Sequence, residues 1–377
     1  MSRPRVVIDS AIRVTPKLRA MRIELVPIDG RDIRSESLKG ARALLTRTVT
    51  RVDESLLAGS NVQFVGTASA GTDHVDLNYL AARDIKFASA AGCNASAVGD
   101  YVLAAIATCG RLEAIVSGAD VGLVGYGHVG RRLARRLTKL GARVKVYDPY
   151  ETQFDGEVDS VALQDVLTCP IVSLHAALHN TPPHPSRYMV GLSEAEMVCD
   201  SALFINAGRG DLMTSGAVTK LLDRGVDVVL DTWPDEPQVP LELLSRVRYG
   251  TPHIAGYSKS SKISATDFLI PSLVEALQLE FGARVADQRR ESISVSTSGC
   301  EDIESLALFL RAVGRIEQDD RKFRRVWSQD QSPSIFESQR RNYVMRQELE
   351  GLSISADETV SPRLAGWLEK LGVAIIR

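Results

Sequence analysis

Three side chains suited to acid–base and anion-binding chemistry follow short apolar runs in the second half of the chain. Arg209 follows ALFINAG, Glu236 follows VDVVLDTWPD, and His253 lies in TPHIAGYS. An arginine can hold a carboxylate through two parallel hydrogen bonds, and a histidine can accept a hydroxyl proton near neutral pH. A glutamate beside that histidine would fix its tautomer and favour the imidazolium. We therefore predict that these three residues form a catalytic set that acts on a hydroxy acid.

Each of the three also has a simpler interpretation when it is taken alone. Arg209 could form a surface ion pair, Glu236 could be a solvated loop charge, and His253 could be packed in the core. The catalytic interpretation rests on their occurrence together, at the ends of successive predicted strands that follow a dinucleotide-binding motif.

That motif is a glycine-rich turn after the predicted strand VGLV at residues 121–124. Gly125 permits a tight turn, Gly127 lets the backbone approach a pyrophosphate, and Gly130 lets the next helix pack closely on the strand. The helix RRLARRLTKLG offers free N–H groups to the pyrophosphate. Alone, this pattern could also be a turn that binds nothing.

The next predicted strand, RVKVYD, ends at Asp148, 18 residues after Gly130. A carboxylate here can accept hydrogen bonds from both ribose hydroxyls of NAD and repel the 2′-phosphate of NADP. The alternative is a turn cap before Pro149. We predict NAD as the cofactor, and hydride transfer from the hydroxy acid as the reaction.

Short apolar runs, among them RVVID, ALLTRTV, VQFVGTA and IVSLHA, alternate with helical patterns over most of the chain. Runs without polar alternation are typical of strands covered on both faces, so the pattern predicts parallel βαβ units. From about residue 290 the pattern changes to SISVSTSG, the helix EDIESLALFLRAVGRI and further elements that end in VAIIR. This segment predicts a small α+β domain.

Composition excludes several other classes of protein. The 377 residues carry a formal charge of -2, which gives no global reason to bind nucleic acid or an anionic membrane. No apolar run approaches the ~18–20 residues of a membrane helix. Five isolated cysteines argue against a disulfide framework or a zinc site, and metal is not needed for the chemistry. We predict a cytoplasmic protein whose partners include neither nucleic acid nor membrane.

The glycine motif and the set of Arg209, Glu236 and His253 resemble the signature of the D-2-hydroxyacid dehydrogenase superfamily. Within it, RTVTRVDESLLAG, FVGTASAGTDHVD, AAGCNASAV and the tail FESQRRNYVMRQELEGL are similar to the erythronate-4-phosphate dehydrogenase family, over nearly the whole chain. The resemblance implies NAD-dependent oxidation of 4-phospho-D-erythronate to (R)-3-hydroxy-2-oxo-4-phosphooxybutanoate in vitamin B6 synthesis. It also implies a homodimer formed by the C-terminal domain.

The resemblance also implies further site residues. Thr48, Ser69 and Tyr257 would contact the substrate, and Arg47 is our candidate for its phosphate, although an arginine in an exposed loop is often only a solvated charge. The alternative for the phosphate is an arginine of a partner subunit, such as Arg340 or Arg341. The residues implied at the NAD site, beyond the three glycines and Asp148, are His128, Val129, Ala176, Ala207, Gly208, Asp231 and Gly256.

The sequence differs from the family pattern at two places near the site, at Ala176 and in the segment from Asp211 to Thr214. Ala176 stands where a threonine hydroxyl would contact the cofactor, which puts the affinity for NAD in doubt. Asp211 adds a negative charge close to Arg209 and could alter substrate affinity. Thr214 can still cap the following helix SGAVTKLLDRG, so the fold should be little affected.

The predicted architecture has a Rossmann-type doubly wound parallel sheet inserted in a flavodoxin-like domain. Residues 1–93 and 257–288 form the substrate-binding domain, residues 94–256 the NAD-binding domain, and residues 289–377 the C-terminal dimerisation domain, with the active site in the cleft between the first two. We expect the apolar helix face in the tail to be too large for its own small domain to cover, which favours a dimer. That face comprises Leu306, Leu308, Phe309, Leu310 and Val313.

Two other functions remain open from the sequence. One is a dehydrogenase for another D-2-hydroxy acid, such as 3-phosphoglycerate. The other is a non-catalytic NAD-sensing protein, because relatives of this fold act as corepressors. Retention of Arg209, Glu236 and His253 speaks against a sensor, which has no need of the full catalytic set.

Overall fold

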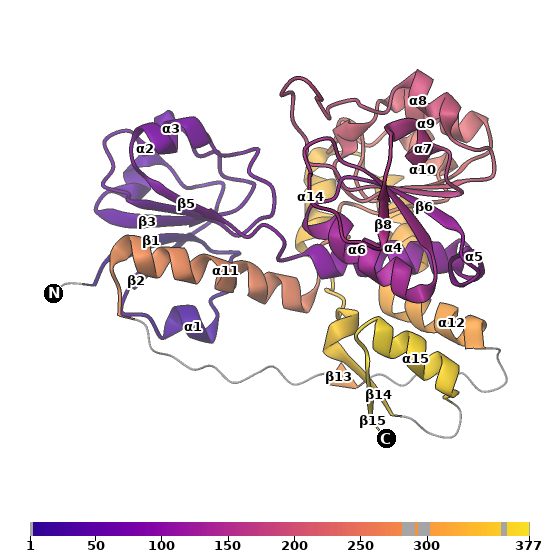
Figure 1. The fold of residues 1–377 in the computed structure, drawn as a ribbon. Coiled ribbons are helices and arrows are strands. Elements are labelled where there is room, and N and C mark those ends of the chain that lie inside the picture. The colour runs from indigo at the N-terminus through magenta and orange to yellow at the C-terminus, as the bar shows by residue number, and fades with distance from the viewer. Residues whose placement is uncertain (1–2, 281–290, 293–301, 356–359, 377) are drawn as a thin grey trace. The chain divides into compact units, whose positions relative to one another are not determined.

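The computed structural model describes residues 3–280, 291–292, 302–355 and 360–376. The chain forms two compact units (Figure 1). The first comprises Met1–Asn94 and Lys259–Arg289, and the second comprises Ala95–Ser258 and Arg290–Arg377. The C-terminal segment therefore groups with the unit that carries the glycine motif.

The first unit is built on a parallel sheet with the order β2-β1-β3-β4-β5, the flavodoxin-like order that the sequence predicted. Neighbouring residues along its strands point to opposite faces, and both faces are buried. Ile8 and Phe64 pack against Leu269 and Leu273 of the long helix, whereas Val7 packs on the other face. The strands are β1 (Arg5–Asp9), β2 (Glu24–Ile28), β3 (Ala41–Thr46), β4 (Phe64–Thr67) and β5 (Lys86–Ser89), and the helices are α1 (Pro16–Arg19), α2 (Glu54–Leu57), α3 (Leu77–Ala82) and α11 (Lys259–Leu277).

The second unit contains a seven-stranded parallel sheet with the order β12-β11-β10-β9-β6-β7-β8. This order reverses between β6 and β9, as in doubly wound dinucleotide-binding sheets, and it confirms the predicted fold class. Its strands are β6 (Asp120–Val124), β7 (Arg143–Tyr147), β8 (Val158–Ser160), β9 (Ile171–Leu174), β10 (Leu203–Asn206), β11 (Asp227–Leu230) and β12 (Tyr249–Gly250).

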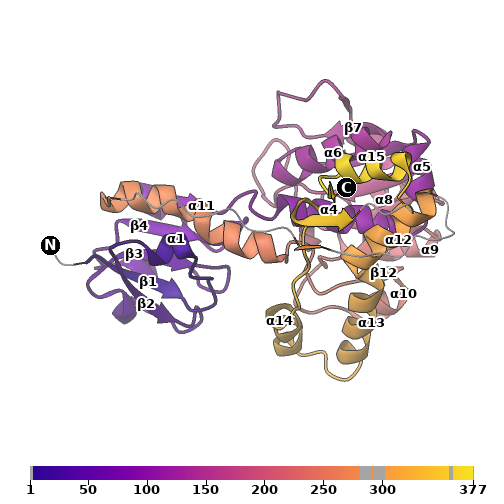
Figure 2. The same cartoon turned by 90° about the horizontal axis from the view of Figure 1, so that it is seen from below.

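Helices cover both faces of this sheet (Figures 1 and 2). One face carries α4 (Ala95–Thr108), α5 (Leu112–Val116) and α6 (His128–Leu140). The other face carries α7 (Leu163–Leu167), α8 (Leu192–Met197), α9 (Ser215–Asp223) and α10 (Leu241–Arg246). The apolar runs along the strands are therefore buried on both sides, which is why they lack polar alternation.

The described part of the tail adds helices and a small parallel sheet, β13-β14-β15, to the second unit. Its elements are β13 (Glu291–Ser292), α12 (Asp302–Gly314), α13 (Ile316–Trp327), α14 (Pro333–Arg341), β14 (Leu352–Ser355), α15 (Pro362–Lys370) and β15 (Ala374–Ile376). Phe323 and Trp327 of α13 pack with Trp233 on the face that α7–α10 cover. Most of the predicted strand SISVSTSG lies outside the described residues.

As predicted, the tail's own domain does not cover the apolar face of α12 by itself, but the step from that face to a second subunit is wrong. The apolar face of α12 is covered within the chain, because α12 packs on α4 and shares its core. Phe309 and Leu310 are each 1% exposed, and only Leu308 of the predicted face reaches 38%. This face therefore gives no reason to expect a second subunit on it.

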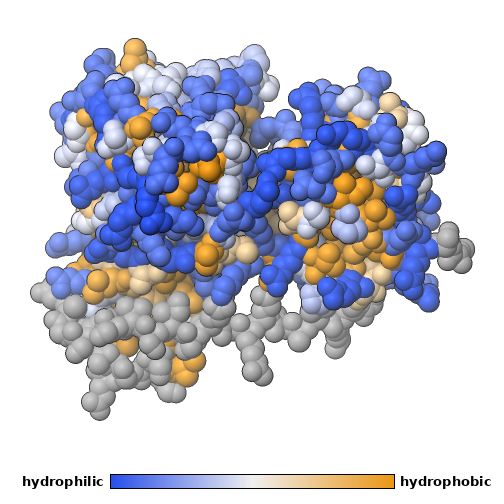
Figure 3. All heavy atoms as spheres, turned by 180° about the vertical axis from the view of Figure 1, so that it is seen from behind, coloured by the Kyte–Doolittle hydropathy of each residue, from blue (hydrophilic) through white to orange (hydrophobic). Residues whose placement is uncertain are grey.

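The surface carries both polar and apolar side chains. On the side seen in Figure 3, charged and polar side chains dominate much of the second unit, and apolar side chains gather on the first. None of the described helices has the length and apolar character needed to cross a membrane.

Candidate active site

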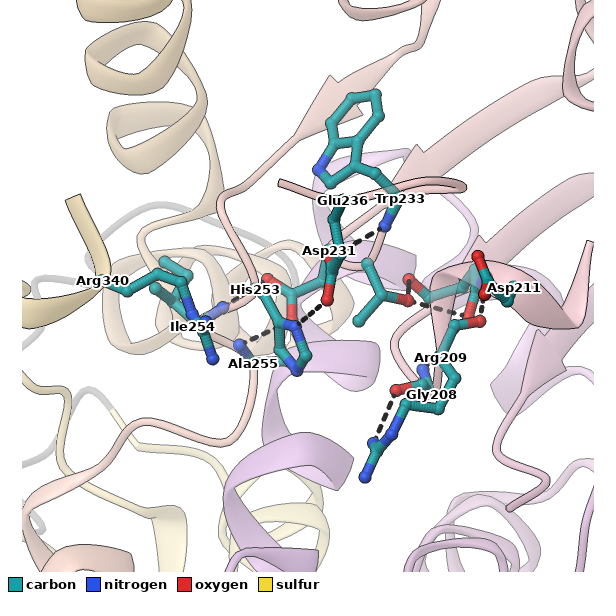
Figure 4. A network of polar contacts seen from close by, with 12 residues as sticks. Gly208, Arg209, Asp211, Asp231, Trp233, Glu236, His253, Ile254, Ala255 and Arg340 are labelled. Carbon is teal, nitrogen blue, oxygen red and sulfur yellow. Dashed lines mark hydrogen bonds and ion pairs between the residues drawn. The ribbon is translucent and has the colours of Figure 1, made fainter. Parts of the chain in front are cut away.

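The three predicted catalytic residues follow neighbouring strands of the second unit. Arg209 lies three residues after β10, Glu236 lies in the loop after β11, and His253 lies three residues after β12. These strands are adjacent and parallel, so their carboxyl ends meet at one edge of the sheet. Figure 4 shows the three side chains at this edge.

His253 and Glu236 form a direct hydrogen-bonded pair. The Nδ1 of His253 lies 2.6 Å from Oε1 of Glu236, and both side chains are about one quarter exposed. The other carboxylate oxygen of Glu236 accepts the N–H of Trp233 at 3.2 Å. Burial acts to raise the pKa of Glu236, but the charge of His253 and its hydrogen bond outweigh burial, so the pKa is lowered. Glu236 is thus an ionised partner of Nδ1, and Nε2 is the ring nitrogen of His253 that Glu236 does not contact.

The loop that carries His253 is held by Asp231. His253 has a φ of 54°, in the left-handed region that is unfavourable for most side chains. The carboxylate of Asp231 accepts the N–H groups of Ile254 at 2.8 Å and Ala255 at 2.9 Å, and the hydroxyl of Thr251 at 2.6 Å. Asp231 is 1% exposed, and burial raises its pKa. Its observed contacts fix the position of the histidine.

Arg209 lies in a turn shaped by Asn206. The side chain of Asn206 accepts the N–H of Gly208 at 3.1 Å and donates to the carbonyl of Arg209 at 3.0 Å. Asn206 is fully buried and ends β10. These contacts fix the backbone on both sides of Gly208, so the position from which the guanidinium extends is set before any substrate binds.

Two residues after Arg209 were singled out by the sequence, Asp211 and Thr214. Asp211 forms an ion pair with Arg187 and accepts the N–H of Asp235 at 3.3 Å. Thr214 caps α9 as predicted, because its hydroxyl accepts the N–H of Ala217 at 3.1 Å.

The glycine turn has the shape that a dinucleotide requires. Gly125 has a φ of 98°, and a Cβ there would lie 2.5 Å from the backbone N of Ala176. A Cβ on Gly130 would lie 2.1 Å from the carbonyl oxygen of Gly125, so the helix can approach only without a side chain. A Cβ on Gly127 would meet no atom within 4 Å. The open space at Gly127, at the start of α6, fits a pyrophosphate.

Asp148 closes this turn from the neighbouring strand. Its carboxylate accepts the N–H of Tyr126, inside the glycine turn, at 2.8 Å and that of Tyr150 at 3.1 Å. Asp148 also lines a pocket of about 660 Å³ together with Gly125 and Ala176. A carboxylate that lines a pocket beside the turn is placed to accept ribose hydroxyls.

The residues predicted to contact the substrate lie in two places. Thr48 and Ser69 each lie two residues after the paired strands β3 and β4, at one edge of the first sheet. Arg47 forms an ion pair with Asp9 at 2.9 Å, and the side chain of Asp9 is 1% exposed. Arg47 therefore compensates a buried charge, whether or not it binds phosphate. Tyr257 belongs to the second unit and follows the loop of His253.

Sequence reasoning missed several residues that shape the site. Asn206 carried a signal, since it is a polar residue at the end of an apolar strand. His74 had none: its Nε2 lies 2.9 Å from the hydroxyl of Thr67, which in turn contacts Ser69 at 2.5 Å. Arg340 of α14 was not missed, but the sequence offered it only as a phosphate ligand from a partner subunit. In the structure it lies beside Tyr257 of its own chain, with its Cζ 5.9 Å from the ring centroid.

The Glu236–His253 pair leads to a pH prediction. Because the pKa of Glu236 is lowered, its carboxylate is negatively charged near neutral pH, directly beside the ring of His253. Glu236→Gln keeps the shape but removes the charge, so the histidine should release its proton at lower pH. We expect the acid limb of the kcat/KM profile to move about one pH unit to the acid side. An unmoved limb would remove Glu236 from proton transfer.

Comparison with known protein families assigns most of the second unit. Residues 107–255 match the NAD binding domain of D-isomer specific 2-hydroxyacid dehydrogenases. Residues 288–372 match a domain of unknown function. The first match spans β6 to β12, and thus the glycine turn and all three catalytic candidates.

Curated relatives match nearly the full chain. The erythronate-4-phosphate dehydrogenase of Pseudomonas putida (strain F1) is 38% identical over 356 residues, which cover 92% of this chain and 93% of that protein. The protein of the same name from Marinomonas sp. (strain MWYL1) is 36% identical over 337 residues, covering 86% and 87%.

Solved structures of lower identity share the fold. A D-lactate dehydrogenase from Aquifex aeolicus, in complex with NAD and lactic acid, has a TM-score of 0.58 at 19% identity and covers 74% of this chain and 100% of its own. The 3-phosphoglycerate dehydrogenase of Entamoeba histolytica, with NAD bound, has a TM-score of 0.60 at 19% identity and covers 73% of this chain and 96% of its own.

Proposed function

Because the chain belongs to the erythronate-4-phosphate dehydrogenase family, we propose that it oxidises 4-phospho-D-erythronate to (R)-3-hydroxy-2-oxo-4-phosphooxybutanoate with NAD, in vitamin B6 synthesis. The observation that carries the proposal is the hydrogen-bonded pair of His253 and Glu236 at the same sheet edge as Arg209. A glycine turn with room for a pyrophosphate lies at the carboxyl end of β6 in the same sheet.

Each catalytic side chain has one task in this reaction. The guanidinium of Arg209 holds the C1 carboxylate, which orients C2. The Nε2 of His253 accepts the proton of the C2 hydroxyl, because its Nδ1 already faces Glu236. Glu236 then stabilises the imidazolium. NAD, when bound, supplies the acceptor for the hydride that leaves C2, so that the alcohol becomes a ketone.

The binding residues remain part of the proposal. Thr48, Ser69 and Tyr257 offer hydroxyl groups that suit a polyhydroxylated acid. Gly127 and the start of α6 would hold the pyrophosphate, and Asp148 the ribose. Proposed contacts at the cofactor site also include His128, Val129, Ala176, Ala207, Gly208, Asp231 and Gly256.

An activity screen of the purified protein tests the substrate. With NAD present, we expect kcat/KM for 4-phospho-D-erythronate to exceed that for 3-phosphoglycerate and D-lactate by about 100-fold or more. Higher activity on 3-phosphoglycerate would replace the proposed substrate but keep the chemistry. NADH binding without turnover of any hydroxy acid would favour the NAD-sensing alternative.

The role of Asp148 is tested by changing the cofactor preference. Asp148→Ser with Pro149→Arg removes the carboxylate and adds a cation, while the serine hydroxyl can still accept the N–H of Tyr126. We expect the ratio of NADP to NAD use to rise about tenfold or more, because repulsion of the 2′-phosphate is lost. The check is kcat/KM for both cofactors. A wild-type preference for NADP would contradict the assignment.

We also propose that the protein is a cytoplasmic homodimer, a state supported by the family resemblance. The expected mass by light scattering at micromolar concentration is twice 41.0 kDa. A mass near 41.0 kDa for the full chain would contradict the dimer.

A further inference from the structure

Arg340 reaches the loop of the catalytic histidine from the tail. It lies near the end of α14, and Figure 4 shows its side chain extending toward the segment of His253 and Ile254. Its Cζ lies 5.9 Å from the ring centroid of Tyr257, and its side chain is only 18% exposed. Its charge also contributes to the lowered pKa of Glu236, so it lies within electrostatic reach of the catalytic pair.

One edge of the Arg340 guanidinium has an unused donor. Nη1 donates to Oε1 of Glu337 at 3.0 Å, whereas Nε is buried and has no hydrogen-bond partner among the described residues. A buried N–H without a partner costs free energy, more so when the group is charged. The Nε–Nη2 edge has the fork geometry that matches two oxygens of a phosphate or carboxylate. An anion at this edge would satisfy the buried donor.

The tail also holds the backbone of the same loop. Arg346, which is 5% exposed, donates from Nη2 to the carbonyl of Ala255 at 2.6 Å. Ser258 donates to Glu348 at 2.5 Å. The loop from His253 to Ser258 is therefore hydrogen-bonded to the tail on both sides of Tyr257. These contacts fix the tail, which carries Arg340, against the loop of the catalytic histidine.

We propose that Arg340 binds the phosphate group of the hydroxy acid through its Nε–Nη2 edge, in the same subunit as the histidine that deprotonates the substrate. This inference rests on the proposed function and names the residue that selects the phosphorylated acid. Arg209 holds the carboxylate at C1, and the phosphorus is separated from C2 by two carbons and one oxygen. Arg340 and Tyr257, which lie beside the loop of His253, form the proposed binding site for the phosphate end of the substrate. The domain of unknown function thereby supplies a specificity residue.

The test compares two acids that differ only in the phosphate. We expect Arg340→Gln to lower kcat/KM for 4-phospho-D-erythronate about 30-fold and to change kcat/KM for D-erythronate less than about threefold. Arg340→Lys keeps the charge but not the fork, and an intermediate loss is expected. Arg341→Gln is the matched control, because Arg341 is the next residue of α14 and is exposed. It should resemble the wild type.

A direct binding measurement separates this inference from the proposed function. Inorganic phosphate, titrated calorimetrically into the NADH-loaded protein, should bind the wild type and Arg341→Gln at least about tenfold more tightly than Arg340→Gln. If the wild type does not prefer 4-phospho-D-erythronate over D-erythronate, the proposed function fails. The phosphate titration then decides by itself whether Arg340 binds a phosphate group.

Other outcomes would overturn the inference. An equal loss for both acids would mean that Arg340 only positions Tyr257. An unchanged ratio and unchanged phosphate affinity in both Arg340 variants would exclude it from anion binding. If Arg47→Lys changed the ratio while the Arg340 variants did not, the phosphate would be bound by Arg47. Should Arg340→Gln fail to fold, the kcat/KM ratio of the two acids and the phosphate affinity of Arg340→Lys decide the question instead.

Discussion

His253→Gln is expected to lower turnover of 4-phospho-D-erythronate by about 100-fold or more while leaving NADH affinity within about twofold. Glutamine can still hydrogen-bond to Glu236, but it cannot take up the hydroxyl proton. The glycine turn and Asp148 are untouched by the change, so cofactor binding should persist. Steady-state turnover and a fluorescence titration with NADH are the two measurements.

Backbone strain at His253 calls for a control. Its φ of 54° is tolerated better by asparagine than by most residues. His253→Asn should therefore match His253→Gln in activity while retaining more thermal stability. Turnover within a few-fold of the wild type in either variant would exclude His253 as the base.

Arg209→Lys is expected to lower kcat/KM about 100-fold or more. Lysine keeps the positive charge, but a single ammonium cannot fix both oxygens of the carboxylate, and misplacement of C2 slows the reaction. The loss should appear in kcat as well as in KM. Arg187→Lys is the control, since Arg187 is tied to Asp211 and should change kcat/KM less than about threefold. A loss below tenfold in Arg209→Lys would mean that another group holds the carboxylate.

The fold and the family could be predicted because the relevant signals are local. Each strand is one continuous apolar run, and the residue that follows it lies at the carboxyl edge of a parallel sheet. Knowing that Arg209 and His253 follow such runs was enough to place them on one edge, and the structure has them there. The contact between His253 and Glu236 followed from the chemistry that a histidine base needs.

What could not be predicted depends on contacts between distant parts of the chain. Arg47 and Asp9 are 38 positions apart, and neither of the apolar runs that contain them, ALLTRTV and RVVID, indicates that they pair. The apolar stripe on α12 was expected to need a second subunit, but amphipathicity does not say which surface covers such a stripe, and α4 of the same chain does so. Asp231 holds two backbone N–H groups more than 20 positions away, a role that only the folded loop reveals.

The packing of α12 on α4 has a consequence for biosynthesis. Roughly 200 residues separate the two helices, so at about 5–20 residues per second the ribosome completes α4 some 10–40 s before α12 emerges. During that interval Ala104, which faces Gly314 of α12, and the rest of this face of α4 lack the partner that later covers them. Nascent chains halted before residue 302 should thus bind chaperones and be cleaved near α4 by added protease, whereas the released full-length chain should resist both.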